Sequence, residues 1–309
     1  MTAPVRSARQ LFADEVRRPE PEMDLARCAL LVAKEQYPQI AVDQYLMRLD
    51  ALAEEVKDRL DQESAPLLVL QEVLATLYER HGFRGNRDAY YDPRNSFLND
   101  VLDRETGIPL TLGIVLLEVA WRLDLPMEGV NFPHHFLVRF RGDAVDLLVD
   151  PFDGGRTRFQ DEAQDLLDRF YGGMVRVRDS FLERAGRRDM LVRLLNNLKG
   201  IWMNVRDDER ALAAVERLLL LRPDAPEEHR TGGLLLARLG RPEEAVEHLE
   251  SYLEARPDAR DADRMRRLVD RLRAGDEVSV DLRGPAARSR GDGGEDDGEP
   301  SGPDAVEGG

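Results

Sequence analysis

Residues 106–126 read TGIPLTLGIVLLEVAWRLDLP and contain the element that decides the fold. Pro109 suits the first turn of a helix, where its missing N–H would have no intrahelical partner anyway. Over residues 110–123 apolar side chains lie on nearly all sides, interrupted by Glu118 and Arg122 at i, i+4 spacing. Because a helix that is apolar all round is normally buried, this stretch predicts the central helix of a domain.

Short strand-like runs follow Pro126. Residues 127–132 (MEGVNF), 135–140 (HFLVRF) and 144–150 (AVDLLVD) are rich in β-branched and aromatic residues, and the RGD at 141–143 offers a tight connection between the last two runs. A buried helix followed by an antiparallel meander predicts an α+β domain.

The chain before this domain has helical periodicity over residues 8–80. The apolar residues of DQYLMRLDALAEEVKDRL fall on one face, and Asp43 is the expected N-cap. Residues 81–102 are loop-rich but carry four aromatic residues, which either plug the loop onto a core or line a pocket. We expect plugging, with Asn95 or Ser96 capping a short helix that ends near Arg104. The four aromatic residues are Phe83, Tyr90, Tyr91 and Phe97.

An internal repeat follows residue 187. LRPDA at 221–225 recurs as ARPDA at 255–259, a shift of 34 residues that also aligns Glu209 with Glu243 and Leu219 with Leu253. A 34-residue helix–turn–helix period is the tetratricopeptide signature. Two units are fewer than a free-standing array needs, so we expect them to pack on the preceding domain or to be capped by the helix RDADRMRRLVDRLRAG.

Composition excludes several classes of function. The net charge of −16 argues against binding to nucleic acid or to an anionic membrane. Cys28 is the only cysteine, which excludes an intramolecular disulfide and a cysteine-based zinc site, and its helical surroundings predict a buried apolar role. With no apolar run long enough to span a bilayer and no leader pattern, we expect a cytoplasmic protein.

The order of helix start, His135 and Asp150 matches three slots of a cysteine-dependent site. In papain-like and transglutaminase-like sites, a cysteine at a buried helix N-terminus gives its proton to a histidine on a strand, which a carboxylate or amide on the next strand orients. Residues 95–140, together with VDPFDGG at 149–155, resemble the transglutaminase-like domain of the bacterial SirB-type proteins, which tetratricopeptide repeats usually follow. The resemblance covers residues 25–260.

Carried over residue by residue, the resemblance implies a degenerate triad. The usual G-x-C opening falls on Gly107-Ile108-Pro109, so Pro109 occupies the nucleophile position, while His135 and Asp150 match the other two roles. The role that is missing at this position is the one that forms the covalent bond.

Two other chemistries stay open. A hydroxyl of Thr106, Thr111 or Ser96 could be activated by His135, although threonines near helix starts are usually caps. A metal site could use Asp150 and Asp153, although His134 and His135, as neighbours on a strand, would point to opposite faces. Without either chemistry, His135 is expected to be a buried imidazole that is hydrogen-bonded to Asp150 and holds two strands together. The alternative is that the same hydrogen-bonded pair contacts a ligand.

The sequence therefore predicts an α+β protein with a transglutaminase-like, papain-like core and an all-α tetratricopeptide module. We expect a helical region at 1–80 packed on a core at 81–180, repeats at 187–274 and a disordered acidic tail at 284–309. The expected function is non-catalytic binding of a protein or peptide through the repeats or the core cleft, with no cofactor and no metal. The alternative is a hydrolase or acyl transferase that uses His135 and Asp150 with a non-cysteine nucleophile. Candidate ligand-binding residues are His134, His135, Asp150, Asp153 and Asn95.

Overall fold

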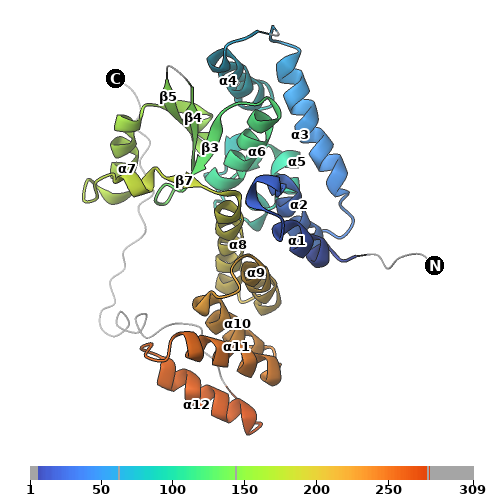
Figure 1. Ribbon diagram of the computed structural model, residues 1–309, viewed down its shortest axis with the longest axis vertical. Coiled ribbons are helices and arrows are strands. Elements are labelled where there is room, and N and C mark those ends of the chain that lie inside the picture. Colours follow the sequence, from blue (N-terminus) through green and yellow to red (C-terminus); the bar gives the residue numbers. More distant parts are fainter. Residues whose placement is uncertain (1–5, 62, 143–144, 277, 279–309) are drawn as a thin grey trace, which may run out of the picture.

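The computed structural model describes residues 6–61, 63–142, 145–276 and 278, and the structural statements below concern these residues. Helices dominate, and a five-stranded sheet lies beside the helices that form the upper half of the molecule (Figure 1). The α+β fold class is confirmed, with a mixed domain followed by a helical module. None of the helices in this part of the chain has both the length and the apolar character that crossing a membrane requires.

Four α-helices precede residue 75 in the described part of the chain. The apolar face predicted for the third of them, α3 (Val42–Lys57), is buried, and Leu49 and Val56 are fully inaccessible to solvent. The expected N-cap is wrong: Ala41 occupies the cap position and Asp43 lies in the first turn, paired with Arg27. The helix begins one residue before Asp43 because Val42 packs into the core. The four helices are α1 (Ala8–Val16), α2 (Leu25–Gln36), α3 (Val42–Lys57) and α4 (Pro66–Leu74), with a π-helical turn at Ala75–Arg80.

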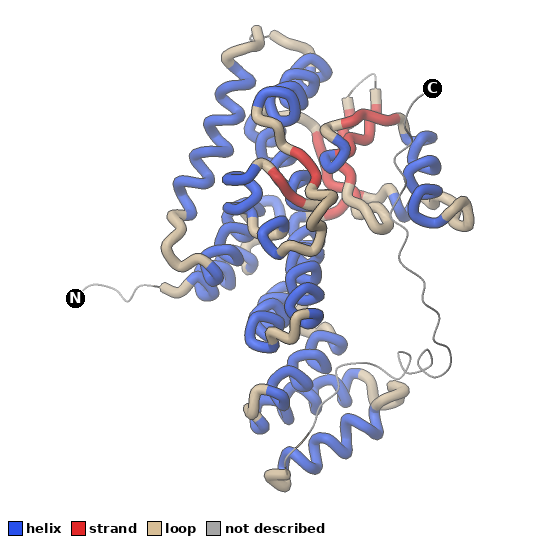
Figure 2. The backbone as a smooth tube through the Cα atoms, turned by 180° about the vertical axis from the view of Figure 1, so that it is seen from behind, coloured by secondary structure: helices blue, strands red, loops and turns tan. Residues whose placement is uncertain are grey.

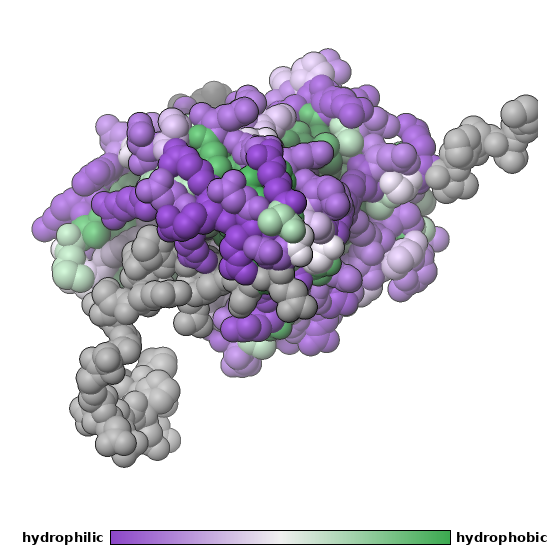
Figure 3. Space-filling view, turned by 90° about the horizontal axis from the view of Figure 1, so that it is seen from below, coloured by the Kyte–Doolittle hydropathy of each residue, from purple (hydrophilic) through white to green (hydrophobic). Residues whose placement is uncertain are grey.

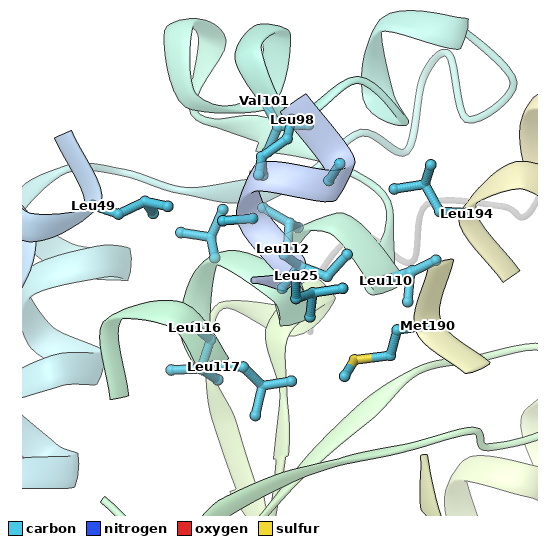
Figure 4. Close-up of a cluster of buried hydrophobic side chains, with 14 of the residues drawn as sticks. Leu25, Leu49, Leu98, Val101, Leu110, Leu112, Leu116, Leu117, Met190 and Leu194 are labelled. Atoms are coloured by element: carbon cyan, nitrogen blue, oxygen red, sulfur yellow. The ribbon is translucent and has the colours of Figure 1, made fainter. Parts of the chain in front are cut away.

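The predicted central helix is α6 (Pro109–Arg122), and its residues 109–120 are all buried. It packs against α2, α3, α4 and α5 (Leu98–Arg104) on one side and against the sheet on the other. Figure 4 shows this core, in which side chains from several helices meet around α6. The labelled members include Leu25, Leu49, Leu98, Leu112, Leu116 and Met190.

The two polar interruptions of α6 pair with each other, and Glu118 also bonds to α2 while Arg122 bonds to Asp50 of α3. Arg122 Nη1 donates to Glu118 Oε2 over 2.6 Å, as the i, i+4 spacing indicated. Glu118 Oε1 also accepts the N–H of Ala26, in the first turn of α2, over 3.0 Å. Burial raises the pKa of Glu118 despite these partners. A charged side chain can be tolerated here because both of its oxygens are hydrogen-bonded.

The expected cap of α5 is wrong. The N-cap position holds Phe97, and no side chain caps this helix. Asn95 instead ends the 3-10 turn Pro93–Asn95. Its Oδ1, the atom that accepts a backbone N–H at an N-cap, instead accepts a hydrogen bond from Asn86 Nδ2 over 3.0 Å.

The meander is confirmed and is longer than the sequence indicated. The strands pair antiparallel throughout, in the order β6-β5-β4-β3-β7, with Val138 between Gly129 and Val149. The RGD connection lies partly outside the described residues, which omit 143 and 144. A separate parallel pair joins β1 (Arg84–Gly85) to β2 (Thr106–Gly107). The sheet strands are β3 (Met127–Val130), β4 (Leu137–Arg141), β5 (Asp146–Asp150), β6 (Arg156–Arg158) and β7 (Arg184–Ala185).

Helices cover both faces of the sheet. Phe136 and Val138 belong to the same core as α6, whereas Leu137 and Leu148 pack with α7 (Ala163–Tyr171) on the opposite face (Figure 1). This division follows from the strand period of two. Gly113 permits the close approach of α6, since a Cβ built there would lie 2.5 Å from the Phe136 ring.

The last five helices stack into an elongated module (Figure 2). Leu194 and Leu195 of α8 pack into the core around α6, whereas α10, α11 and α12 form a second core that includes Met265 and Val269 of α12. The repeat is confirmed: α9 and α11 end at positions 34 residues apart. The surface at the α12 end is mostly hydrophilic (Figure 3). The proposed acidic tail at 284–309 lies outside the described residues. The helices are α8 (Arg187–Asn204), α9 (Asp208–Leu221), α10 (Pro226–Arg238), α11 (Pro242–Ala255) and α12 (Ala262–Arg273).

Candidate functional site

Pro109 occupies the first helical position of α6, directly after the N-cap residue Ile108. A network of neighbouring groups fixes this helix start. The Thr111 hydroxyl donates to the carbonyl oxygen of Asn95 over 2.6 Å and accepts the Ile108 N–H over 3.2 Å. A helix N-terminus favours negative charge, but the pyrrolidine ring has no group that can carry a charge or attack a carbonyl. The position therefore supports the fold without supplying a nucleophile.

His135 and Asp150 form a buried hydrogen-bonded pair behind this helix. His135 Nε2 lies 2.8 Å from Asp150 Oδ1, and the two side chains are only 6% and 3% exposed. Asp150 Oδ1 also accepts the N–H groups of Phe152 and Asp153, each over 3.1 Å. Burial favours a higher pKa for Asp150, but the bond from His135 and the two backbone N–H groups outweigh it and lower the pKa. An ionised carboxylate only accepts hydrogen bonds, so Nε2 carries a proton.

Aromatic rings cover this pair. The His135 ring lies edge-on to Phe152, with 6.1 Å between centroids, and 5.9 Å from Phe170. The expectation of plugging holds for two of the four loop aromatics, because Phe83 and Phe97 are buried. Tyr90 and Tyr91 remain 39% and 79% exposed. Phe152 and Phe170 are therefore the aromatic rings described beside His135.

Contrary to the expectation, His135 does not lie on a strand, and neither does His134. His134 occupies a turn before β4 with a φ of 54°, in the left-handed region. Pro133 precedes it, and strand pairing resumes only at Leu137. The exposed His134 ring packs against Tyr171, with centroids 5.3 Å apart, while the ring of His135 turns inward. The two imidazoles thus diverge because of this turn.

Asp153 and Asn95 have partners of their own. Asp153 accepts a hydrogen bond from Arg87 over 3.0 Å, and Arg158 lies 3.6 Å away. Asn95 is fully buried, and its Oδ1 accepts from Asn86 over 3.0 Å. Asp153 is therefore balanced by arginines, and Asn95 holds the loop between β1 and α5.

Other reactive chemistry finds little support in the described residues. No group of three or more His, Cys, Asp or Glu side chains in them is arranged to hold a metal ion. Cys28 is fully buried, and desolvation raises the pKa of its thiol, as expected for a buried apolar role. The Thr106 hydroxyl donates to the carbonyl oxygen of Arg104. The hydroxyls of Thr106 and Thr111 are thus both hydrogen-bonded. Of the three candidate hydroxyls, Ser96 has no partner among the described residues.

A cavity of about 560 Å³ opens beside the start of α6. Tyr90 and Tyr91 form one wall, Ser96 and Ile108 belong to the core side, and residues 196–205 of α8 and its C-cap form the other wall. The α8 residues include Asn196, Asn197 and Asn204. These residues belong to the stretch LLNNLKGIWMNV at 194–205. Its three asparagines and mid-helix glycine are the sequence signal that could have marked this wall.

The comparisons divide the chain at α8. Residues 43–196 match the transglutaminase-like superfamily, and residues 198–270 match a tetratricopeptide repeat family. A UPF0162 protein of Xylella fastidiosa (strain 9a5c) is 36% identical over 252 residues, which cover 80% of this chain and 90% of that protein. UPF0162 protein PA3419 of Pseudomonas aeruginosa is 31% identical over 229 residues, covering 74% and 83%. Protein SirB1 of Salmonella typhimurium is 31% identical over 224 residues, covering 72% and 81%.

Proposed function

The chain belongs to the family of the UPF0162 and SirB1 proteins, and we propose that it is a non-catalytic transglutaminase-like and tetratricopeptide protein that binds a protein or peptide partner. Tetratricopeptide modules commonly present extended binding surfaces. The proposal therefore assigns the function to recognition and treats the transglutaminase-like core as a scaffold.

The observation that carries this proposal is Pro109 at the first position of α6. Covalent acyl transfer needs a side chain that attacks a carbonyl carbon and later leaves. Proline offers neither a lone pair nor an acidic proton. It also begins the helix well, so selection for folding explains this residue without any catalytic role.

The surroundings of His135 support the same conclusion. A general base must reach the proton it removes, directly or through one water. The His135 side chain is 6% exposed, and because Nε2 is bonded to Asp150, only Nδ1 could take a proton from a nucleophile. The threonine hydroxyls near the helix start are committed to backbone carbonyl groups. The pair therefore serves best as a hydrogen-bonded link between the turn before β4 and the end of β5.

Two surfaces are available for a partner. One is the exposed side of the repeat helices, and the other is the cavity between the core and α8. Their chemistry differs, because α10 and α11 carry exposed acidic residues such as Glu227 and Glu243, whereas the cavity has exposed Tyr91 and Val205 at its edge.

The experiment is a cross-linking pull-down from cells that contain the protein, with the full-length chain as bait. One variant combines Glu227→Lys and Glu243→Lys on the repeat helices, and a second combines Tyr91→Glu and Val205→Glu at the cavity. All four residues lie on the surface, so the variants are expected to fold, which circular dichroism checks. A partner that is lost with one variant supports the proposal. A set of captured proteins that neither variant changes would contradict it.

A further inference from the structure

The cavity beside the start of α6 contains a buried hydroxyl with no hydrogen-bond partner. Ser96 lines the cavity and is 1% exposed, and its Oγ contacts no donor or acceptor among the described residues. A buried polar group without a partner costs free energy in the unliganded protein. A ligand that offers a hydrogen-bonding group at this place would remove that cost.

Three asparagine amides line the same cavity from α8. Asn196 and Asn204 are exposed and Asn197 is half-buried, so their amides are open to a ligand. Asn196 and Asn204 are eight residues apart on the helix, a rise of about 12 Å at 1.5 Å per residue. Each amide has two donors and an acceptor, so it can accept a peptide N–H and donate to a peptide C=O together.

Gly200 lies between these asparagines in the middle of α8. A Cβ built on it would meet no atom within 4 Å, so packing inside the protein does not require a glycine here. Glycine in a helix interior is less favourable than alanine by roughly 1 kcal/mol. One physical reason for such a glycine is the close approach of another backbone.

The remaining lining is apolar and uncharged. Tyr90, Tyr91, Ile108, Ile201 and Val205 complete it, and no Asp, Glu, Lys, Arg or His is among its lining residues. A charged ligand would therefore lose hydration without gaining an ionic partner. The volume of about 560 Å³ lies within the usual range for a ligand site.

From these features we propose that the cavity binds an uncharged, extended peptide segment, a conclusion that rests on the proposed binding function. A backbone that alternates N–H and C=O groups matches the row of amides on α8. At 3.3 Å per residue, about four residues span the distance from Asn196 to Asn204. The closest approach of the peptide backbone is at Gly200, a neutral apolar side chain contacts Tyr90 and Tyr91, and Ser96 bonds to the segment at the cavity floor.

The probe is a set of acetylated and amidated octapeptides made of neutral residues, each with one Leu, Phe or Tyr near its centre. Comparator sets replace two flanking residues by Asp or by Lys. Calorimetry with the full-length chain measures the dissociation constant. We expect neutral members to bind with Kd below about 1 mM, and both charged sets to bind at least about tenfold more weakly because the cavity offers no counter-charge.

Two variants separate binding from folding, because each is expected to stabilise the free protein. Ser96→Ala removes an unpaired hydroxyl, and Gly200→Ala raises helix propensity in open space. Each should raise Tm or leave it unchanged. Each should also weaken peptide binding by roughly threefold to tenfold, Ser96→Ala because one hydrogen bond is lost and Gly200→Ala because the new methyl group displaces the peptide. Thr231→Ala on α10, whose hydroxyl bonds only to the Glu227 carbonyl oxygen, is the matched control and should leave the affinity unchanged.

Several outcomes overturn this assignment. If no neutral peptide binds, or if a charged set binds best, the ligand class is wrong, while a partner captured through the repeat helices would still support the proposed function. If neutral peptides bind and neither Ser96→Ala nor Gly200→Ala weakens them, the cavity is not their site. If no peptide binds and the pull-down captures no partner that either variant removes, the proposed function is rejected as well.

Discussion

His135 Nε2 lies 2.8 Å from Asp150 Oδ1 in a place where neither side chain is more than 6% exposed, so the bond ties the turn before β4 to the end of β5 inside the protein. The resemblance matches the same two residues to the base and orienting positions of the transglutaminase-like arrangement. We propose that the pair has a role in stability, which its burial and the proline at the helix start support and which can be measured.

The first prediction concerns loss of the imidazole. His135→Ala leaves the Asp150 carboxylate buried without its main side-chain partner and creates a cavity between Phe152 and Phe170. We expect the free energy of unfolding to fall by about 3 kcal/mol. His135→Gln retains a donor, so it should cost about half as much. Urea unfolding followed by circular dichroism measures both values, and equal stability of the wild type and the alanine variant would rule out a structural pair.

The second prediction concerns acid. The pKa of Asp150 is lowered in the folded protein from its ordinary value of 3.8. A lowered folded pKa contributes stability above the unfolded pKa, and that contribution is lost as the pH falls through the folded pKa. Asp150→Asn should therefore destabilise the protein most above about pH 5 and progressively less below about pH 4. Urea unfolding from pH 6 to pH 3 gives the difference, and a difference independent of pH would contradict the assignment.

The third prediction compares two glycines in helix interiors. Gly113→Ala in α6 would place a Cβ 2.5 Å from the Phe136 ring, so overpacking should outweigh the gain in helix propensity and lower stability by about 1–3 kcal/mol. Gly200→Ala in α8 meets no atom within 4 Å and should instead raise stability by up to about 1 kcal/mol. Thermal unfolding of the two variants checks the opposite signs. Destabilisation by both would show that α8 is packed differently from this structure.

The fourth prediction concerns the only thiol. Cys28 is fully buried in α2, and desolvation raises its pKa, so the thiolate form is disfavoured in the folded protein. A colorimetric disulfide reagent at pH 8 should detect almost no thiol in the native protein and one thiol per chain in urea. Rapid reaction in the native state would show that the packing of α2 against α6 opens readily.

Much of the fold follows from local sequence pattern. An unbroken apolar helix and a 34-residue period are strong signals, and α6 and the paired ends of α9 and α11 lie where they predicted. Caps were less predictable, because Asp43 pairs with Arg27 of the preceding helix and Asn95 bonds to residues of its own loop. Strand β7 is two residues long and pairs with β3 far back in the chain, so no local pattern could reveal it.

The candidate site was predictable only in part. The motifs identified His135 and Asp150, and their order in the chain suggested their contact. The turn at His134 depends on a left-handed backbone conformation that a strand pattern does not reveal. The cavity could not be predicted from the sequence. Its walls come from residues about 100 positions apart, which come together only when α8 packs against the core.

The central claim, that this transglutaminase-like core is not catalytic, is tested most directly by turnover measurements on the wild type and His135→Gln. The assays follow hydrolysis of an activated ester and amine incorporation into a glutamine-containing peptide, with folding of both proteins checked by circular dichroism. The account predicts no turnover above the buffer rate for either protein. Wild-type turnover that His135→Gln abolishes while the fold remains intact would contradict the claim and establish the pair as part of an active site.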